Sequence, residues 1–162
     1  MTKLLLSLHV LAAIVAVGPV TVAASMFPAT LRRALGDPGH GDALTAVTAL
    51  RTLHRICRVY AGVGIAVPVF GFATASSLGV LGDTWLIVSI LLTAAAAGVL
   101  ALLILPAQDR ALAEAGTSGA PSSSPSAPLS PGRLAMLTGI FNLLWATVTV
   151  LMIVRPGSTT GA

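Results

Sequence analysis

Four long apolar stretches constrain this chain more than any other feature of its sequence. They lie at residues 4–27, 59–80, 84–105 and 134–154, and none of them contains Asp, Glu, Lys or Arg. An α-helix needs about 20 mostly apolar residues to cross the hydrocarbon core of a bilayer. We therefore predict an all-α integral membrane protein whose four spans form an up-down four-helix bundle.

The composition supports a membrane protein. Hydrophobic residues make up 56% of the 162 residues and charged residues only 9%, whereas soluble domains carry about 25% charge. We treat residues 1–162 as one transmembrane domain. Residues 113–132 are rich in Ser, Pro, Ala and Gly and have nothing to bury, so we predict a flexible cytoplasmic linker there.

The basic residues predict the orientation of the bundle. Lys3 and Arg155 lie at the outer ends of the first and last spans. The other seven lie in or beside the two connections that join span one to span two and span three to span four: Arg32, Arg33, Arg51, Arg55, Arg58, Arg110 and Arg133. Because basic loops stay in the cytoplasm, we predict a multi-pass protein of the plasma (inner) membrane with both termini outside.

The first span has an alternative interpretation as a cleaved signal peptide. Lys3 would supply its basic start, and VAAS at residues 22–25 would supply the cleavage site. Cleavage would place the first connection and its five arginines outside, against the basic bias of the whole chain. We therefore favour a first span that stays in the membrane.

Arg51, Arg55 and Arg58 form a basic stripe where the second span meets the cytoplasmic surface. Their spacings of four and three place them on one face of a helix. Such a stripe attracts anionic lipid headgroups with about 1 kcal/mol per basic residue. An acidic cytoplasmic partner is the alternative, and we expect no nucleic-acid partner because these charges first set the topology.

Polar residues inside the spans are candidate functional residues. His9 lies near the outer end of span one, and Thr138, Asn142, Trp145 and Thr149 form a stripe along span four. Because span four runs outward, we expect its outer part to contact His9. This contact is either an interhelical hydrogen bond, worth about 0.6 kcal/mol, or part of a proton or ligand site.

The positions of the histidines limit any haem site. His9 is near the outer face, His54 precedes span two at the inner face, and His40 lies in the first connection. His9 and His54 are thus nearly a membrane thickness apart, so one protomer cannot hold a haem between two histidines. Two haem alternatives remain: a haem bound by His9 alone, or one shared by the His9 residues of two copies of the chain.

A second candidate site lies at the inner end. Met26, His54, Cys57 and Met136 lie at similar depth, and these residue types are the ligands that Cu(I) prefers. The methionines can equally be packing residues, and the arginines around His54 disfavour a cation.

Backbone and small-residue features complete the prediction of the bundle. Pro19 and Pro68 lie inside spans and are expected to kink them. Asp83 is expected to cap the third helix with its side chain. Gly71 and Ala75 are one of several small pairs spaced by four, which favour close helix packing in lipid.

The stretch LLLSLHVLAAIVAVGP at residues 4–19, followed by a basic connection and three more spans, resembles a known family. This is a family of small predicted integral membrane proteins of unknown function, common in high-GC actinobacteria. Its LHxxxA/G pattern is matched by Leu8, His9 and Ala13. A more distant likeness is to the copper-resistance D type of membrane protein, which also begins with a Leu-His helix. The resemblance implies the four-span fold.

Catalytic patterns are missing from the sequence. All five acidic residues lie in or beside predicted loops, and no phosphate-binding glycine loop, serine-protease set or HExxH is present. We therefore expect no enzyme and no cofactor, but a structural, accessory or assembly component that binds lipid, another membrane protein or a second copy. The alternatives are a haem- or copper-binding redox or metal-handling protein, and a small-solute transporter with a cavity between His9 and Asn142.

Overall fold

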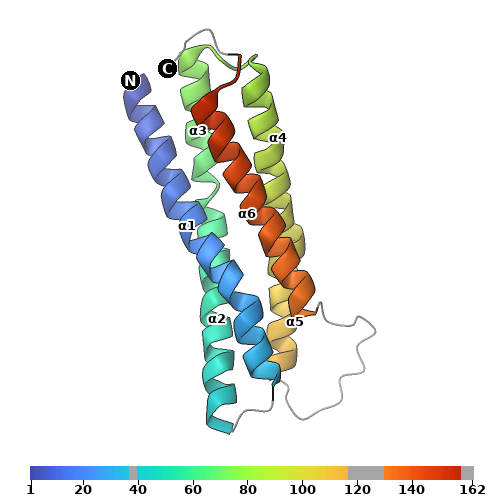
Figure 1. Cartoon of the computed structure of the whole chain (residues 1–162). Coiled ribbons are helices and arrows are strands. Elements are labelled where there is room, and N and C mark those ends of the chain that lie inside the picture. The colour runs from blue at the N-terminus through green and yellow to red at the C-terminus, as the bar shows by residue number, and fades with distance from the viewer. Residues whose placement is uncertain (37–39, 117–129, 158–162) are drawn as a thin grey trace.

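The computed structural model describes residues 1–36, 40–116 and 130–157, with only the backbone for residues 40–43. Its helices form four antiparallel columns, and the start of α1 and the end of α6 lie at the same end of the bundle (Figure 1). All four columns are long and apolar enough to cross a membrane. The all-α, up-down membrane bundle is thereby confirmed.

The columns consist of one to three segments each. In chain order these are α1 (Thr2–Leu35); α2 (His40–Val63) with α3 (Ala66–Leu78); α4 (Thr84–Gly98) with the π-helical segment η1 (Val99–Ile104) and α5 (Leu105–Gly116); and α6 (Pro131–Val154).

The two ends of the bundle differ in charge. We call the end with both termini and the α3–α4 turn the terminal end (Figure 1). We call the opposite end, where α1 leads to α2 and α5 leads to α6, the basic end, because its exposed side chains include seven arginines. That the basic end faces the cytoplasm stays a prediction from the charge bias.

The helices extend beyond their predicted spans at the basic end. α1 continues from the predicted limit at 27 to Leu35, and the second column begins at His40 rather than 59. Residues 113–116, expected to be linker, belong to α5. Residues 117–129 of that linker and residues 37–39 lie outside the described residues. The extension is helical because α2 is amphipathic there and has an apolar face to bury.

This extension has an apolar core of its own. We call it the basic-end core; α1, α2, α5 and α6 all contribute to it, with Phe27, Leu31, Leu50, Ala107, Ala111, Ala115 and Leu134. Farther up the bundle, the outward-facing large side chains are apolar, as contact with lipid requires; they include Ile14, Leu91, Leu102 and Leu143. The bundle therefore joins a lipid-facing part to a packed basic end.

The second column is interrupted at Gly64 and Ile65, between α2 and α3. Pro68 has no N–H to donate to the Gly64 carbonyl, so Val67 N donates to that oxygen at 3.1 Å instead. The predicted distortion at Pro68 is thus confirmed. By contrast, α1 runs through Pro19 without interruption.

Asp83 corrects a sequence prediction. It occupies the position before the first turn of α4, but its side chain makes no capping hydrogen bond. Its carboxylate instead accepts from the indole Nε1 of Trp85 at 2.9 Å, and the Arg155 guanidinium lies 5.6 Å from the centroid of that ring. The Asp83 carboxylate was expected to accept from backbone N–H groups of α4. It accepts from the indole N–H of Trp85 instead.

Candidate functional site

Four polar side chains meet between α2 and α5 at the basic end. We call His54, Cys57, Gln108 and Asp109 the basic-end cluster. Gln108 is fully buried; its Oε1 lies 3.0 Å from Nδ1 of His54, and its Nε2 donates to Sγ of Cys57 at 3.7 Å. Nε2 of His54 lies 2.9 Å from Oδ1 of Asp109. One buried amide therefore links a histidine, a thiol and, through the ring, a carboxylate.

The geometry of the cluster admits two proton arrangements. With Nε2 of Gln108 donating to Cys57, its Oε1 can only accept, so Nδ1 of His54 carries a proton. Nε2 of His54 then faces a carboxylate, which suits the doubly protonated, charged ring. If the amide is turned over, a neutral ring protonated on Nε2 satisfies the same neighbours. Rotation of the Gln108 amide thus converts one hydrogen-bond arrangement into the other.

Sequence reasoning found half of the cluster. The spacing of three between His54 and Cys57 places both on the buried face of α2, where Cys57 packs against Ala23 and Ala24 of α1. It missed Gln108 and Asp109, which come shortly after the end of the predicted third span. The available signal was weak, because an amide one turn into a polar helix looks the same whether it faces the core or water.

The structure does not bring the predicted Cu(I) ligands together. His54 and Cys57 are buried and engaged by Gln108, whereas the side chains of Met26 and Met136 are 54% and 57% exposed. Among residues whose side chains are described, no group of three or more His, Cys, Asp or Glu is placed to hold a metal ion. Met26 faces outward because Ala23, Ala24 and Phe27 occupy the packed face of α1. Met136 faces outward because Leu134 and Thr138 occupy the packed face of α6.

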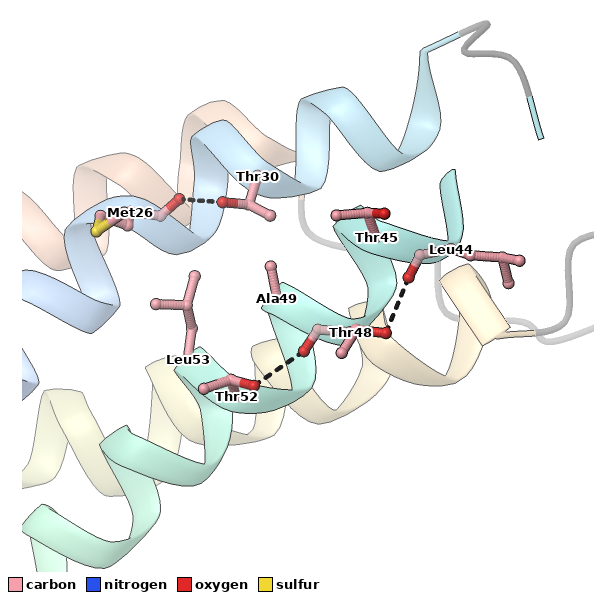
Figure 2. A pocket seen from close by; sticks show the side chains of 8 residues that line it. All are labelled: Met26, Thr30, Leu44, Thr45, Thr48, Ala49, Thr52 and Leu53. Carbon is pink, nitrogen blue, oxygen red and sulfur yellow. Dashed lines mark hydrogen bonds between the residues drawn. The ribbon is translucent and has the colours of Figure 1, made fainter. Parts of the chain in front are cut away.

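A groove of about 570 Å³ runs between α1 and α2 at the basic end (Figure 2). Its walls combine apolar side chains with threonines: Met26, Thr30, Leu44, Thr45, Thr48, Ala49, Thr52 and Leu53. The hydroxyls of Thr30, Thr48 and Thr52 each donate to the carbonyl four residues earlier, at 3.0, 2.9 and 3.1 Å. Their oxygens can therefore still accept a hydrogen bond from a ligand, but their protons are already used.

Exposed arginines lie close in sequence to the groove threonines on both of the helices that form the groove. Arg51 and Arg55 each follow a groove threonine of α2 by three residues, and Arg33 follows Thr30 of α1 by three. Residues three apart are neighbours on a helix surface. Arg58 continues the α2 stripe by another turn, and all of these side chains are exposed. The arrangement places positive charge beside hydroxyl acceptors and an apolar floor.

His9 packs against the second column, which corrects the predicted contact with span four. Its Nδ1 lies 2.9 Å from the carbonyl oxygen of Val67, so this nitrogen carries the proton and donates. A Cβ on Gly71 would lie only 2.9 Å from Cε1 of the ring. Thr149 is exposed and donates to the carbonyl of Trp145 in its own helix. Because Gly71 has no side chain, the His9 ring can come close enough to the backbone of α3 to donate to Val67.

The other part of the polar stripe on α6 contacts α1. Nδ2 of Asn142 donates to Oγ of Ser25 at 3.2 Å, and the Thr138 hydroxyl lies 3.5 Å from the carbonyl oxygen of Ala24. Ser25 is about 24 Å along α1 from His9 at 1.5 Å per residue. His9 and Asn142 therefore do not line a common cavity, contrary to the arrangement expected for a transporter.

Comparison with known proteins gives one match. A family model described as predicted integral membrane protein (DUF2269) matches residues 3–156. No curated protein and no solved structure matches the chain.

Proposed function

This chain belongs to the DUF2269 family of predicted integral membrane proteins, and we propose that it is a non-enzymatic accessory component of the plasma membrane. In this role the basic end binds anionic lipid. It thereby supports the assembly of another membrane protein, or of a second copy of the chain, at the cytoplasmic surface.

The observation that carries this proposal is the exposed arginine stripe on a packed helical extension. Arg51, Arg55 and Arg58 are exposed on α2, whereas Leu50, His54 and Cys57 of the same helix are buried in the bundle. Because the backbone beneath the stripe is held by the core and by the cluster, the arginines need little ordering before they bind. Each basic residue near an anionic surface contributes about 1 kcal/mol.

The groove between α1 and α2 favours a particular headgroup chemistry (Figure 2). A phosphodiester would pair with Arg33 or Arg55, which follow groove threonines of α1 and α2 by three residues. The threonine oxygens would accept from hydroxyl groups on the headgroup, because they have no free proton to donate. A glycerol-bearing anionic lipid such as phosphatidylglycerol supplies both the charge and the hydroxyl donors.

Native mass spectrometry of the purified protein tests this role. We expect more retained molecules of phosphatidylglycerol than of phosphatidylcholine with matched acyl chains. The variant Arg51→Gln/Arg55→Gln/Arg58→Gln should lose this preference. The matched control Arg32→Gln/Arg110→Gln/Arg133→Gln removes the same charge from elsewhere at the basic end and should keep most of it. Equal retention of both lipids by the wild-type protein would contradict the proposal.

A haem role for His9 is the second candidate function. Because Nδ1 of His9 donates to a backbone carbonyl, its Nε2 keeps a lone pair, which is the arrangement that metal-bound histidines adopt. An optical spectrum of the purified protein beside a His9→Ala variant tests it. A haem band that disappears in the variant would establish this role. A colourless wild-type protein would leave His9 as a packing residue.

A further inference from the structure

A second cavity lies at the break between α2 and α3, in the lipid-facing part of the bundle. Its volume is about 180 Å³, and it shares no residue with the groove at the basic end. Apart from Thr93, whose hydroxyl donates to the carbonyl of Ser89 at 2.7 Å, its lining residues are aliphatic, aromatic or glycine. Ile65, Pro68 and Ala97 of this lining are exposed, so the cavity opens sideways towards the bilayer. A molecule dissolved in the hydrocarbon can therefore enter it directly.

The opening exists because the second and third columns pack against each other at one end only. At the basic end α2 packs against α5, where the basic-end cluster joins the two helices. Farther from that end, α3 packs on α1 and α4 packs on α6 rather than on each other. Ile65 and Ala97 belong to these two columns, so the cavity lies between them. Residues of α1 and α6 complete the lining: Ala16, Val17, Val20, Phe141 and Trp145.

The backbone of both columns is irregular beside the cavity. The second column is interrupted at Gly64 and Ile65, and both residues line the cavity. The third column changes to π-helix at Val99, and Leu100 of that segment also lines the cavity. Short π-helical segments are rare and occur frequently at functional sites. The opening thus differs from the regular helix surfaces that face lipid elsewhere in the bundle.

The lining and the access from lipid specify a hydrocarbon chain as the occupant. No charged side chain lines the cavity. An apolar cavity of about 150 Å³ accommodates a benzene molecule, so the present volume can take a segment of an acyl chain. Because the surrounding bilayer is equally apolar, the cavity alone cannot select one lipid over another. Selection requires a contact with the headgroup.

Arg58 is placed to make that contact. It is exposed on α2 and precedes Ala61, a lining residue, by three positions. Residues three apart are neighbours on a helix surface, and three residues rise by about 5 Å. Arg58 is also the member of the arginine stripe closest in sequence to the cavity, whereas Arg51 lies about two turns farther towards the basic end. Its long side chain can therefore hold a headgroup at the polar surface while the cavity lies in the adjoining hydrocarbon.

We propose that the cavity at the helix break holds one acyl chain of an anionic phospholipid of the cytoplasmic leaflet, whose phosphate pairs with Arg58. The inference rests on the proposed binding of anionic lipid at the basic end and deepens it. Arg51 and Arg55 attract such lipids to the surface, and Arg58 together with the cavity retains one molecule between the second and third columns. A headgroup in the groove between α1 and α2 belongs to a separate lipid.

The two tryptophans of the protein make the test direct. Trp145 lines the cavity, whereas Trp85 lies at the terminal end beside Asp83. In a Trp85→Phe variant all tryptophan fluorescence therefore comes from Trp145, and bromine atoms on an acyl chain quench it only at close contact. In phosphatidylcholine vesicles, we expect a small fraction of chain-brominated phosphatidylglycerol to quench Trp145 more than the same fraction of phosphatidylcholine brominated at the same position. Equal quenching by the two lipids would overturn the proposal.

The headgroup contact is tested in the same background. Arg58→Gln should abolish the preference for brominated phosphatidylglycerol. The matched control Arg51→Gln removes the same charge from the same stripe but farther from the cavity, and it should keep most of the preference. Equal losses in the two variants would show general attraction to the basic surface and would overturn the assignment to Arg58.

The cavity is tested separately from the headgroup. Ala97→Leu in the Trp85→Phe background should fill the opening and reduce quenching by brominated phosphatidylglycerol to the level of brominated phosphatidylcholine. Ala95→Leu, at an exposed position of the same helix that does not line the cavity, should leave quenching unchanged. Unchanged quenching in Ala97→Leu would refute the chain site.

These results separate the chain site from the proposed function. Selective retention of phosphatidylglycerol in the mass spectrometer, combined with equal quenching by both brominated lipids, would refute the chain site and leave the accessory role intact. Absence of a phosphatidylglycerol preference in both experiments would overturn both.

Discussion

The two histidines whose side chains the structure describes have different kinds of partners for their ring nitrogens. His9, in the lipid-facing part, donates to one backbone carbonyl and lies against a glycine. His54, at the basic end, contacts an amide and a carboxylate from another helix. A histidine at membrane depth is thus satisfied by neutral backbone, whereas one near the aqueous surface has partners that can share a charge. The two rings therefore differ in whether a charged side chain is among their neighbours.

The largest effect should come from Gln108→Leu, which breaks the basic-end cluster. The change leaves His54 Nδ1 without its buried partner and removes the donor to Cys57. A buried polar group without its partner costs about 1–3 kcal/mol, and we expect a loss of free energy of unfolding of about 2 kcal/mol. Unfolding of the purified protein by SDS in mixed micelles, followed by circular dichroism, measures it.

Two further variants sharpen this test. Replacing both partners in Gln108→Leu/His54→Leu should recover part of the loss, because no polar group is then left unpaired. Asp109→Asn should cost at most about 1 kcal/mol, since the carboxylate side chain is 59% exposed and exposed ion pairs contribute little. A cost for Gln108→Leu no larger than that for Asp109→Asn would show that the cluster adds nothing to stability.

The next effect should come from Gly71→Ala, which tests the close approach of His9. The new Cβ would lie 2.9 Å from the ring, so the ring must move and weaken its bond to Val67. Overpacking costs typically about 1–3 kcal/mol, and we expect the lower part of that range here. The same SDS titration measures it. Gly62→Ala is the matched control, because a Cβ there meets nothing within 4 Å.

The double variant His9→Ala/Gly71→Ala distinguishes this clash from a general effect of the substitution. Removal of the ring should relieve the strain, so the two single effects should not add. Strictly additive losses would mean that Gly71 matters for a reason other than the ring of His9.

The smallest effect should come from His9→Phe, which keeps a ring over Gly71 and removes only the hydrogen bond. Interhelical hydrogen bonds in membranes average about 0.6 kcal/mol, and we expect a loss of that size. A loss above about 2 kcal/mol would exceed the largest values known for such bonds. It would break the contrast between His9 and the charged cluster around His54.

Much of the fold could be predicted because it depends on local properties of the chain. The length of each apolar stretch defines a span, and the positions of the arginines define which connections share an end. The limits of the helices at the basic end could not be predicted in this way. There the amphipathic turns around Leu50 continue beyond the bilayer because a protein core, not lipid, buries their apolar face.

The sites were less accessible from sequence than the fold. The spacing of His54 and Cys57 placed them together on one face, but their partner Gln108 lies on another helix. The expected contact of His9 with span four was wrong because depth alone does not specify a partner. Two helices lie at the depth of His9, and the ring packs against α3 because Gly71 has no side chain there.

The sequence by itself therefore determined that this chain crosses a membrane four times, that its ends lie together and that its arginines gather at the opposite end. These properties follow from hydropathy and charge, which act on each segment separately. Only the tertiary structure decided which faces of the helices meet, and with them the partners of His9 and His54, the groove beside the arginines and the cavity at the helix break. Those depend on the rotation of each helix about its axis, which is set by the sum of many small packing contacts among neighbours distant in sequence.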